Sequence, residues 1–212
     1  MQCGHHYGEV YAFPVWSTQR ESTLPPDHSN YHSTRIAWIL TKNENESFNL
    51  APFSYFAPVS SDPALVMVSI GNKSADQAKD TKHNLLREKE CVLHIPSEAL
   101  MNAVNESAAN LPYGESELPN THVSLADFTK TLPRIQQANV AMHCRLFDIH
   151  SLGNASFQAV YLEILDVHVE EDLITEAHSR IYIDNKKLNP LARLGGDDYA
   201  LVGKTVTMKR PN

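Results

Sequence analysis

The chain has 212 residues, enough for one large domain or two small ones, and its 25 acidic and 18 basic side chains give a net charge near −7. This balance argues against a nucleic-acid or anionic-membrane surface, because both partners need a cationic patch. We also expect neither a membrane span nor a signal peptide, since no apolar stretch approaches about twenty residues. Cys3, Cys91 and Cys144 are widely spaced, which suits a reducing compartment and predicts a cytoplasmic protein.

Residues 1–34 show little periodicity, and we expect them to form a leader that packs on or near the domain of residues 35–212. Five side chains in this leader could be drawn as metal ligands: Cys3, His5, His6, His28 and His32. No pair of them has a standard metal-site spacing, so a flexible or draping segment is favoured over a metal site.

The first predicted strand is Ile36–Thr41, which the polar residues 43–47 turn back toward Phe48 as a hairpin. Residues 49–63 contain three prolines, which remove amide donors and fix φ, so this segment cannot be helical and makes a poor central strand. Residues 64–70 are an apolar, β-branched run before Gly71, and they predict a strand buried on both faces.

Two interpretations of residues 49–63 stay open from the residues alone. A planar ligand with polar edges could lie against them, with Asn49, Ser54 and free backbone amides as donors. Alternatively, the segment is a packed, proline-rich connection whose aromatic side chains fill the core.

Residues 76–89 predict a helix with a thin apolar stripe of Ala78, Leu85 and Leu86. Lys79, Asp80 and Thr81 lie near its start, with Asn84 one turn on. Backbone amides at a helix N-terminus, a lysine and a threonine hydroxyl make a good phosphate site. Phosphate would repel Asp80, which would instead cap the helix or accept from a ligand hydroxyl. The alternative is an ordinary solvated N-terminal turn.

The second half of the chain predicts more strands and few helices. The predicted strands are 91–95, 140–149, 157–169 (the longest), 181–183 and 205–208; the predicted helices follow Ser97, with Leu100, Met101 and Val104 on one face, and Ser124, over 124–127. Many strands without regular β-α-β alternation indicate a mainly β fold, an antiparallel barrel with short peripheral helices.

No established catalytic or nucleotide-binding motif occurs in the sequence. His94 and His143 lie in predicted strands, and we expect them to be hydrogen-bonded barrel residues rather than ligands or bases. No nucleophile-and-base pair can be assembled. The residues therefore predict neither a catalytic side chain nor a metal site.

Five short motifs occur along the chain: Ile36-Ala37-Trp38, Asn49-Leu50-Ala51-Pro52-Phe53-Ser54-Tyr55-Phe56, Val59-Ser60-x-Asp62-Pro63, Lys79-Asp80-Thr81-x-x-Asn84 and Arg193-Leu194-Gly195-Gly196-x-x-Tyr199. Together, from about residue 32 to residue 200, they resemble the flavin reductase-like family of FMN-binding split-barrel proteins. The resemblance implies an antiparallel split β-barrel that forms a homodimer, with one FMN per subunit near the dimer interface.

The resemblance also implies a set of cofactor-binding residues. The segment that lines the flavin matches Asn49, Ala51, Pro52 and Ser54, and a strand-end position beside the ligand matches Ser69. The phosphate and ribityl contacts match Lys79, Asp80 and Thr81, with Asn84 behind them. A C-terminal motif close to the site matches Arg193 and Tyr199.

Three positions depart from the family pattern. Many relatives carry Pro-Arg-Pro where this chain has Ser33-Thr34-Arg35, which displaces Arg35 by one position and puts a ligand role for it in doubt. Asn45 stands near the usual hairpin glycine, and His143-Cys144 replaces a frequent Glu-Cys. None of these changes touches the flavin-lining segment.

The resemblance implies an FMN-dependent NAD(P)H:flavin oxidoreductase, whose acceptor is a partner oxygenase or another flavin acceptor. A missing acid–base pair is no objection, because hydride transfer is the cofactor's own chemistry. The alternative is an FMN-holding electron carrier or binding module that never reacts with NADH or NADPH. A homodimer is expected also because residues 157–169 are apolar on both faces, while one barrel interior can cover only one of them.

Overall fold

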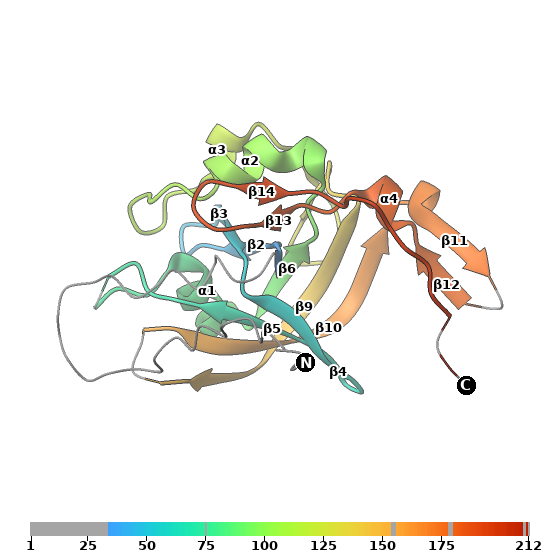
Figure 1. The fold of residues 1–212 in the computed structure, drawn as a ribbon. Helices are drawn as coiled ribbons and strands as arrows, with labels where there is room; N and C mark the ends of the chain where they lie inside the picture. Colours follow the sequence, from blue (N-terminus) through green and yellow to red (C-terminus); the bar gives the residue numbers. More distant parts are fainter. Residues whose placement is uncertain (1–33, 75, 154–155, 178–179, 210, 212) are drawn as a thin grey trace, which may run out of the picture.

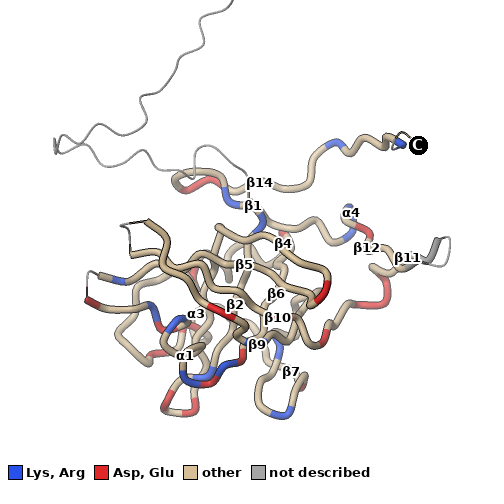
Figure 2. Tube along the Cα trace, turned by 90° about the horizontal axis from the view of Figure 1, so that it is seen from below, with Lys and Arg blue, Asp and Glu red and all other residues tan. Residues whose placement is uncertain are grey.

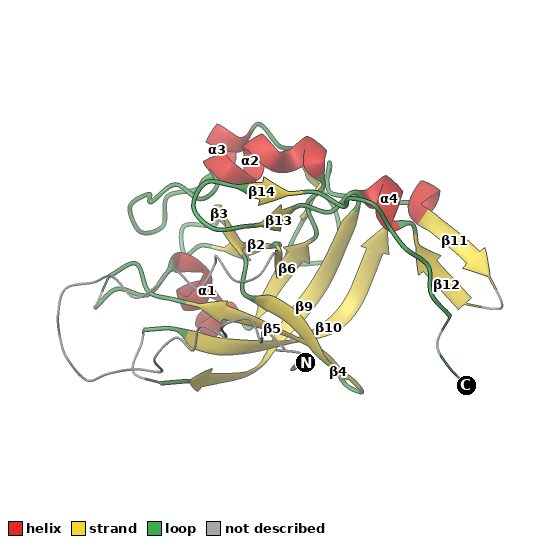
Figure 3. Ribbon diagram, in the orientation of Figure 1, coloured by secondary structure: helices red, strands yellow, loops and turns green. Residues whose placement is uncertain are grey.

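The computed structural model describes residues 34–74, 76–153, 156–177, 180–209 and 211. The leader side chains that could be drawn as metal ligands, and the draping segment favoured in their place, lie outside the described residues. The fold is mainly β, with a large antiparallel sheet and short helices at its periphery (Figures 1 and 3). The predicted fold class is therefore confirmed.

Seven strands form the main sheet, in the order β3-β2-β6-β9-β10-β5-β4. Their bounds are β2 (Ala37–Lys42), β3 (Phe48–Phe53), β4 (Phe56–Ser61), β5 (Ala64–Ile70), β6 (Glu90–His94), β9 (Val140–Ser151) and β10 (Gln158–Val169). The two strands that contain proline, β3 and β4, are the edge strands, because proline cannot donate to a second neighbour. The sequence therefore placed them correctly as poor central strands.

The smaller elements surround this sheet. They are β1 (Thr34–Arg35), β13 (Ala192–Arg193) and β14 (Tyr199–Ala200) in a three-stranded sheet; the pairs β7 (Leu125–Ala126) with β8 (Arg134–Ile135) and β11 (Ile174–Ala177) with β12 (Arg180–Ile183); helices α1 (Asp80–Glu88), α2 (Met101–Glu106), α3 (Leu118–Thr121) and α4 (Asn185–Leu188); and 3-10 turns over Glu98–Leu100 and Glu171–Leu173. In Figure 1 the β11–β12 hairpin projects away from the main sheet.

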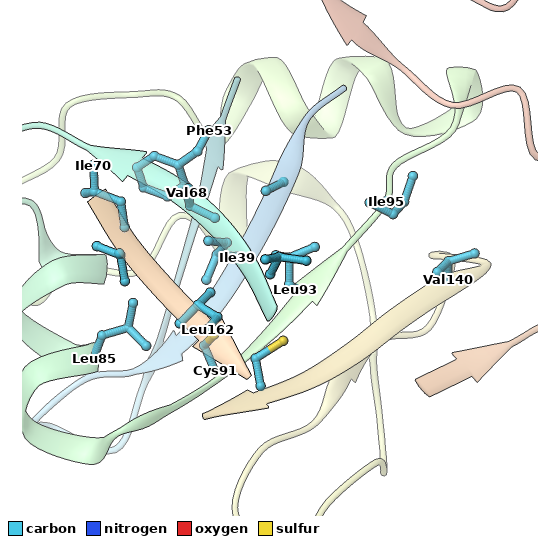
Figure 4. Packing of buried hydrophobic residues seen from close by; sticks show 14 of the residues in the cluster. Ile39, Phe53, Val68, Ile70, Leu85, Cys91, Leu93, Ile95, Val140 and Leu162 are labelled. Atoms are coloured by element: carbon cyan, nitrogen blue, oxygen red, sulfur yellow. The ribbon is translucent and has the colours of Figure 1, made fainter. Parts of the chain in front are cut away.

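Two apolar clusters hold the fold together. One fills the barrel interior between β5, β6, β9 and β10 and includes Val68, Leu93 and Leu162 (Figure 4). The other packs the outer face of β2 against α2 and the loop before β9, with Trp38 fully buried at its centre. The Trp38 indole donates a 2.8 Å hydrogen bond to Ser107 Oγ, which ties the end of α2 to the barrel.

Four local predictions were wrong or incomplete. The predicted helix 76–89 begins only at Asp80, because Lys73 N donates to Gln77 O at 2.8 Å and Ala78 forms a β-bridge with Asn72. Residues 124–127 form no helix, since Leu125 pairs with Ile135 in a short ladder. Residues 205–208 form no strand and lie exposed. Strand β5 is buried on one face, with alternate residues only partly covered.

Candidate functional site

Three neighbouring cavities meet at Pro52 on the edge strand β3. The helix lobe, about 290 Å³, lies at the start of α1 and is lined by Asn49, Lys79 and Thr81 among others. The aromatic lobe, about 260 Å³, is lined by Tyr55 and Phe157, and the arginine lobe, about 160 Å³, by Arg193 and Tyr199. Pro52 lines all three lobes, so together they form one branched site.

Local sequence explains why β3 presents this surface. Pro52 pairs with Trp38 on one side of β3 and has no amide to offer on the other, so the free edge stays open. Phe53 is buried in the core, whereas Ser54 and Tyr55 form the bend into β4 and face the lobes. Phe53 thus fills the core, as a packed connection would, while its neighbours line a cavity. That a planar ligand lies in this cavity stays a prediction.

A buried polar network fixes Asn49 and Thr81 in the helix lobe. Asn49 Nδ2 donates to Thr81 Oγ1 at 2.9 Å and to Thr41 Oγ1 at 3.3 Å. Asn84 Nδ2 donates to Thr41 Oγ1 at 3.1 Å and to Asn43 Oδ1 at 2.8 Å. Because Thr81 Oγ1 accepts from Asn49, its own proton is available to a ligand.

The start of α1 is buried rather than solvated. Thr81 is 1% exposed and Asp80 is 3% exposed, so the alternative of a solvated N-terminal turn was wrong. Lys79 is the extended N-cap residue and makes no side-chain capping bond. The first amides of α1 have no intrahelical acceptor, which leaves them available to an anion.

Lys79 is a cation without a counterion in this lobe. Its Nζ lies 5.5 Å from the ring centroid of Phe53, and no described carboxylate forms an ion pair with it. Burial lowers the pKa of the Lys79 ammonium, and the nearby charge of Lys73 lowers it further. An anion bound here would relieve both effects.

Asp80 does not cap the helix, contrary to one of the two roles predicted for it. Its carboxylate oxygens lie 3.1 and 3.2 Å from Lys73 Nζ, and Gly114 N donates to Oδ2 at 3.4 Å. Lys73 also donates to Leu111 O at 2.9 Å. The two charges compensate each other, which leaves Lys79 as the uncompensated cation of the helix lobe.

Glu117 also lines the helix lobe, and sequence reasoning missed it. Its Oε2 accepts a 2.9 Å hydrogen bond from Leu50 N, and burial raises the pKa of its carboxyl. No local pattern marks Glu117 or Lys73 as site residues. They arrive from a loop and a turn that only the folded chain brings over β3.

The aromatic lobe is lined by Tyr55 and Phe157, and the Phe157 ring packs beside the backbone of Gly71. The rings of Tyr55 and Phe157 meet edge to face, with centroids 6.3 Å apart. A Cβ added to Gly71 would lie 3.1 Å from the Phe157 ring, so the ring rests on the bare backbone. Ser69 also lines this lobe, and its amide donates to Tyr55 O at 2.9 Å.

The arginine lobe is built by the C-terminal strands β13 and β14. The Arg193 guanidinium lies 4.7 Å from the ring centroid of Tyr199 and donates to Gly196 O. Tyr199 donates through its hydroxyl to Asn105 Oδ1 at 3.3 Å, which links the motif to α2. Arg35 is exposed on β1 and does not line the lobe, in keeping with its displaced position.

Ten of the eleven predicted cofactor-binding residues line this branched site. They are Asn49, Ala51, Pro52, Ser54, Ser69, Lys79, Asp80, Thr81, Arg193 and Tyr199. The eleventh, Asn84, lies behind the cavity and positions Thr41. That these residues bind a cofactor stays a prediction, and the geometry brings them together.

The two strand histidines differ from each other. His94 is fully buried, with Nδ1 3.0 Å from Trp38 O and Nε2 accepting from Ile135 N at 3.0 Å, so its prediction is confirmed. Burial lowers the pKa of His94 to about 4. His143 makes no hydrogen bond through either ring nitrogen, which lie 3.5 Å from Glu90 Oε2 and 3.7 Å from Asp166 Oδ2. For His143 the prediction was wrong, because its neighbours stand beyond hydrogen-bond distance.

Within the described part of the chain, no helix is both long and apolar enough to cross a bilayer. The same residues contain no cluster of three or more His, Cys, Asp and Glu side chains arranged to hold a metal ion. In the view of Figure 2, basic and acidic stretches alternate along the tube rather than gathering on one side.

Comparison with known proteins gives consistent results. Residues 29–190 match the flavin reductase like domain. The uncharacterized protein YwrF of Bacillus subtilis is 32% identical over 183 residues, which cover 84% of this chain and 87% of that protein.

Solved structures match the fold as well. Component B of nitrilotriacetate monooxygenase from Bacillus cereus has a TM-score of 0.80 and 28% identity, covering 93% of this chain and 100% of that one. A protein from Shewanella frigidimarina NCIMB 400, assigned as a flavin reductase with a split barrel domain, has a TM-score of 0.74 and 17% identity, covering 86% and 89%. This chain therefore belongs to the flavin reductase-like family and has its split-barrel fold.

Proposed function

We propose that this protein binds FMN in the branched site and transfers hydride from NADH or NADPH to it. The observation that carries the proposal is the uncompensated Lys79 ammonium at the N-terminus of α1, beside the free hydroxyl proton of Thr81. A phosphate needs such a set of donors. The lobes that meet at Pro52 together reach the size typical of ligand pockets.

The residues present fit the parts of FMN. Lys79 and Thr81 would hold the phosphate, and Asn49 positions the Thr81 hydroxyl for that contact. Ala51, Pro52 and Ser54 offer short side chains, and β3 offers an open strand edge, to a flat ring system. When bound, FMN would supply the hydride-accepting chemistry, and the chain's residues would orient it and exclude water.

The proposed chemistry needs no acid–base pair from the protein, because hydride transfer belongs to the cofactor. Glu117 is the carboxyl in the helix lobe whose pKa is raised, and it already accepts from Leu50 N. We therefore assign no catalytic side chain. The competing function is an electron carrier that holds FMN without reacting with a nicotinamide.

The deciding experiment is anaerobic mixing of FMN-loaded protein with NADH or NADPH in a stopped-flow spectrometer. We expect saturable bleaching of the flavin absorbance at a rate that supports turnover, about 1–10³ per second. Absence of bleaching, with FMN bound at one per chain, would establish the carrier instead. No binding of FMN or FAD at micromolar protein would refute both functions.

We propose further that the protein is a homodimer. Phe147 on β9 and Leu165 and Val167 on β10 expose 54%, 39% and 56% of their surface, and Ile181 on the projecting hairpin exposes 71%. Large apolar side chains that are exposed in a single subunit favour burial against a partner. Light scattering should give about twice the 23.7 kDa chain mass with FMN bound. A mass of one chain, with and without FMN, would refute the dimer.

The acceptor of the electrons is proposed to be an oxygenase or free flavin. The likeness to component B of a two-component monooxygenase supports a partner enzyme of this class. Cys91 and Cys144 are both free and buried, which supports a reducing, cytoplasmic setting.

A further inference from the structure

The branched site contains a second uncompensated cation, and FMN has only one phosphate. Of the three basic side chains that line the lobes, Lys73 is paired with Asp80. Lys79 and Arg193 form no ion pair with any described carboxylate. These two cations line different lobes, which both adjoin Pro52.

The chain holds Arg193 ready for a ligand. Its guanidinium lies on the Tyr199 ring at 4.7 Å, and one nitrogen donates to Gly196 O. Arginine has five N–H donors in a planar fork, so most of them stay free in this arrangement. Hydrogen bonding of Tyr199 to Asn105 fixes the platform, which lowers the entropy lost when the fork binds an anion.

Carboxylates close to Arg193 in the sequence do not neutralise its charge. Asp197 and Asp198 lie in the turn between β13 and β14, yet neither forms an ion pair with Arg193. The Asp198 amide instead donates to Gly195 O at 3.3 Å, and Asp198 O accepts from Leu194 N at 3.0 Å. Neither carboxylate of the turn therefore neutralises Arg193, in a protein whose net charge is −7.

We propose that Arg193 recognises an anionic group of the second substrate, the molecule that exchanges hydride or electrons with the flavin. The inference rests on the proposed function, and it separates the flavin phosphate at Lys79 from a second anion at Arg193. The anion has two chemical sources, the diphosphate of a reduced nicotinamide dinucleotide or an acidic substituent on an aromatic acceptor. Pro52 and Ser54, shared between lobes, place such a group next to the flavin-lining segment.

The first arm of the test compares an anionic and a neutral hydride donor. Arg193→Gln and wild type, both loaded with FMN, are mixed anaerobically with NADH or with uncharged 1-benzyl-1,4-dihydronicotinamide. Loss of a charge-assisted contact should raise the donor concentration for half-saturation about ten- to a hundredfold for NADH alone. The limiting rate of bleaching should be preserved, because Arg193 holds the donor at a distance from the reacting ring.

The second arm makes the same comparison for acceptors. FMN-loaded protein, reduced with dithionite and freed of excess reductant, is mixed with 1,4-naphthoquinone-2-sulfonate or with neutral 1,4-naphthoquinone. Each quinone takes two electrons and two protons from the reduced flavin and becomes the hydroquinone. Selective loss for the sulfonate identifies the acceptor as the source of the anion, and selective loss for NADH identifies the donor.

Binding measurements and control variants complete the design. FMN affinity, followed by fluorescence quenching, should stay within about twofold in Arg193→Gln, and NAD⁺ binding to the loaded protein should weaken if the donor is the source. Arg193→Lys should recover part of the affinity, since it keeps the charge but not the fork. Tyr199→Leu should give the same selectivity with a smaller loss, and it serves if Arg193→Gln folds poorly. Arg145→Gln, on an exposed arginine paired with Glu163, should change nothing.

Two results would overturn the inference. Equal effects on charged and neutral reactants in both arms would show that Arg193 recognises no anion of a second substrate. A loss of FMN affinity as large as the loss for NADH would show that Arg193 holds the flavin itself. Failure of the proposed function looks different, because wild type would then bind no FMN or would not be bleached by either donor.

Discussion

Replacing Lys79 by Met tests whether the helix lobe recognises phosphate. Lys79 has no carboxylate partner among the described residues, and its Nζ lies over the Phe53 ring, 5.5 Å from the centroid. Methionine is an unbranched side chain like lysine and removes the charge. The expected loss is one charge-assisted hydrogen bond, about 1.5–3 kcal/mol, which corresponds to a ten- to hundredfold weaker FMN complex.

Riboflavin provides the control ligand for this variant, because it has the same ring and ribityl chain without the phosphate. Fluorescence titration should show its affinity unchanged in Lys79→Met. Lys204→Met, at an exposed lysine, should leave both affinities unchanged. Lys79→Met and Lys204→Met each remove one positive charge from a protein of net charge −7. The overall charge therefore cannot explain a loss of FMN affinity that occurs in Lys79→Met alone.

The pH dependence offers an independent check on the same contact. Burial and Lys73 lower the pKa of Lys79 in the free protein, and a bound phosphate would raise it again. FMN affinity should therefore be constant at neutral pH and fall as the pH rises through the lowered pKa of Lys79. Riboflavin affinity should stay flat over that range. Equal losses for FMN and riboflavin, or no loss in the variant, would refute phosphate recognition by Lys79.

Three further predictions concern the scaffold of the site. Lys73→Met should lower the free energy of unfolding by about 3 kcal/mol in denaturant titrations, because it leaves the buried Asp80 unpaired, and adding Asp80→Asn should restore part of the loss. The pKa of His94 is about 4 in the folded protein and 6.5 in the unfolded chain, so the folded state keeps this imidazole neutral. The free energy of unfolding should therefore decrease by up to about 3 kcal/mol as the pH falls from 6.5 to 4. An equally steep decrease in His94→Asn would contradict this. Gly71→Ala should displace the Phe157 ring and lower the free energy of unfolding by less than about 1 kcal/mol, since Phe157 is 44% exposed. In titrations the variant should bind FMN and riboflavin with equally reduced affinity, and a loss for FMN alone would contradict this.

Much of the fold follows from local sequence pattern. The strands β2, β5, β6, β9 and β10 were predicted close to their observed bounds, because runs of β-branched and apolar residues bounded by turns have few other uses. The missing amide donors predicted that residues 49–63 make a poor central strand, and the strands formed there, β3 and β4, are edge strands. Nine of the ten lining residues were identified through short motifs that resemble the family, and the tenth, Ser69, through its place at a strand end.

Local pattern failed where a distant partner decides the conformation. Residues 124–127 have the spacing of a helix start, yet Leu125 and Ala126 pair with β8 as the short strand β7. Likewise, an apolar run predicted burial on both faces of β5, while the barrel interior covers only one. Periodicity reports which residues avoid water and does not report which surface covers them.

The chemistry of the site shows the same division. Local pattern indicated the proline-rich segment and the helix start as candidates for a ligand site, and it left a packed connection and a solvated turn open as alternatives. The charge balance depends on tertiary contacts: Lys73 neutralises Asp80, while Lys79 and Arg193 stay uncompensated. These pairings join residues of separate segments, and an ion pair depends on a distance of a few ångströms that no spacing along the chain encodes.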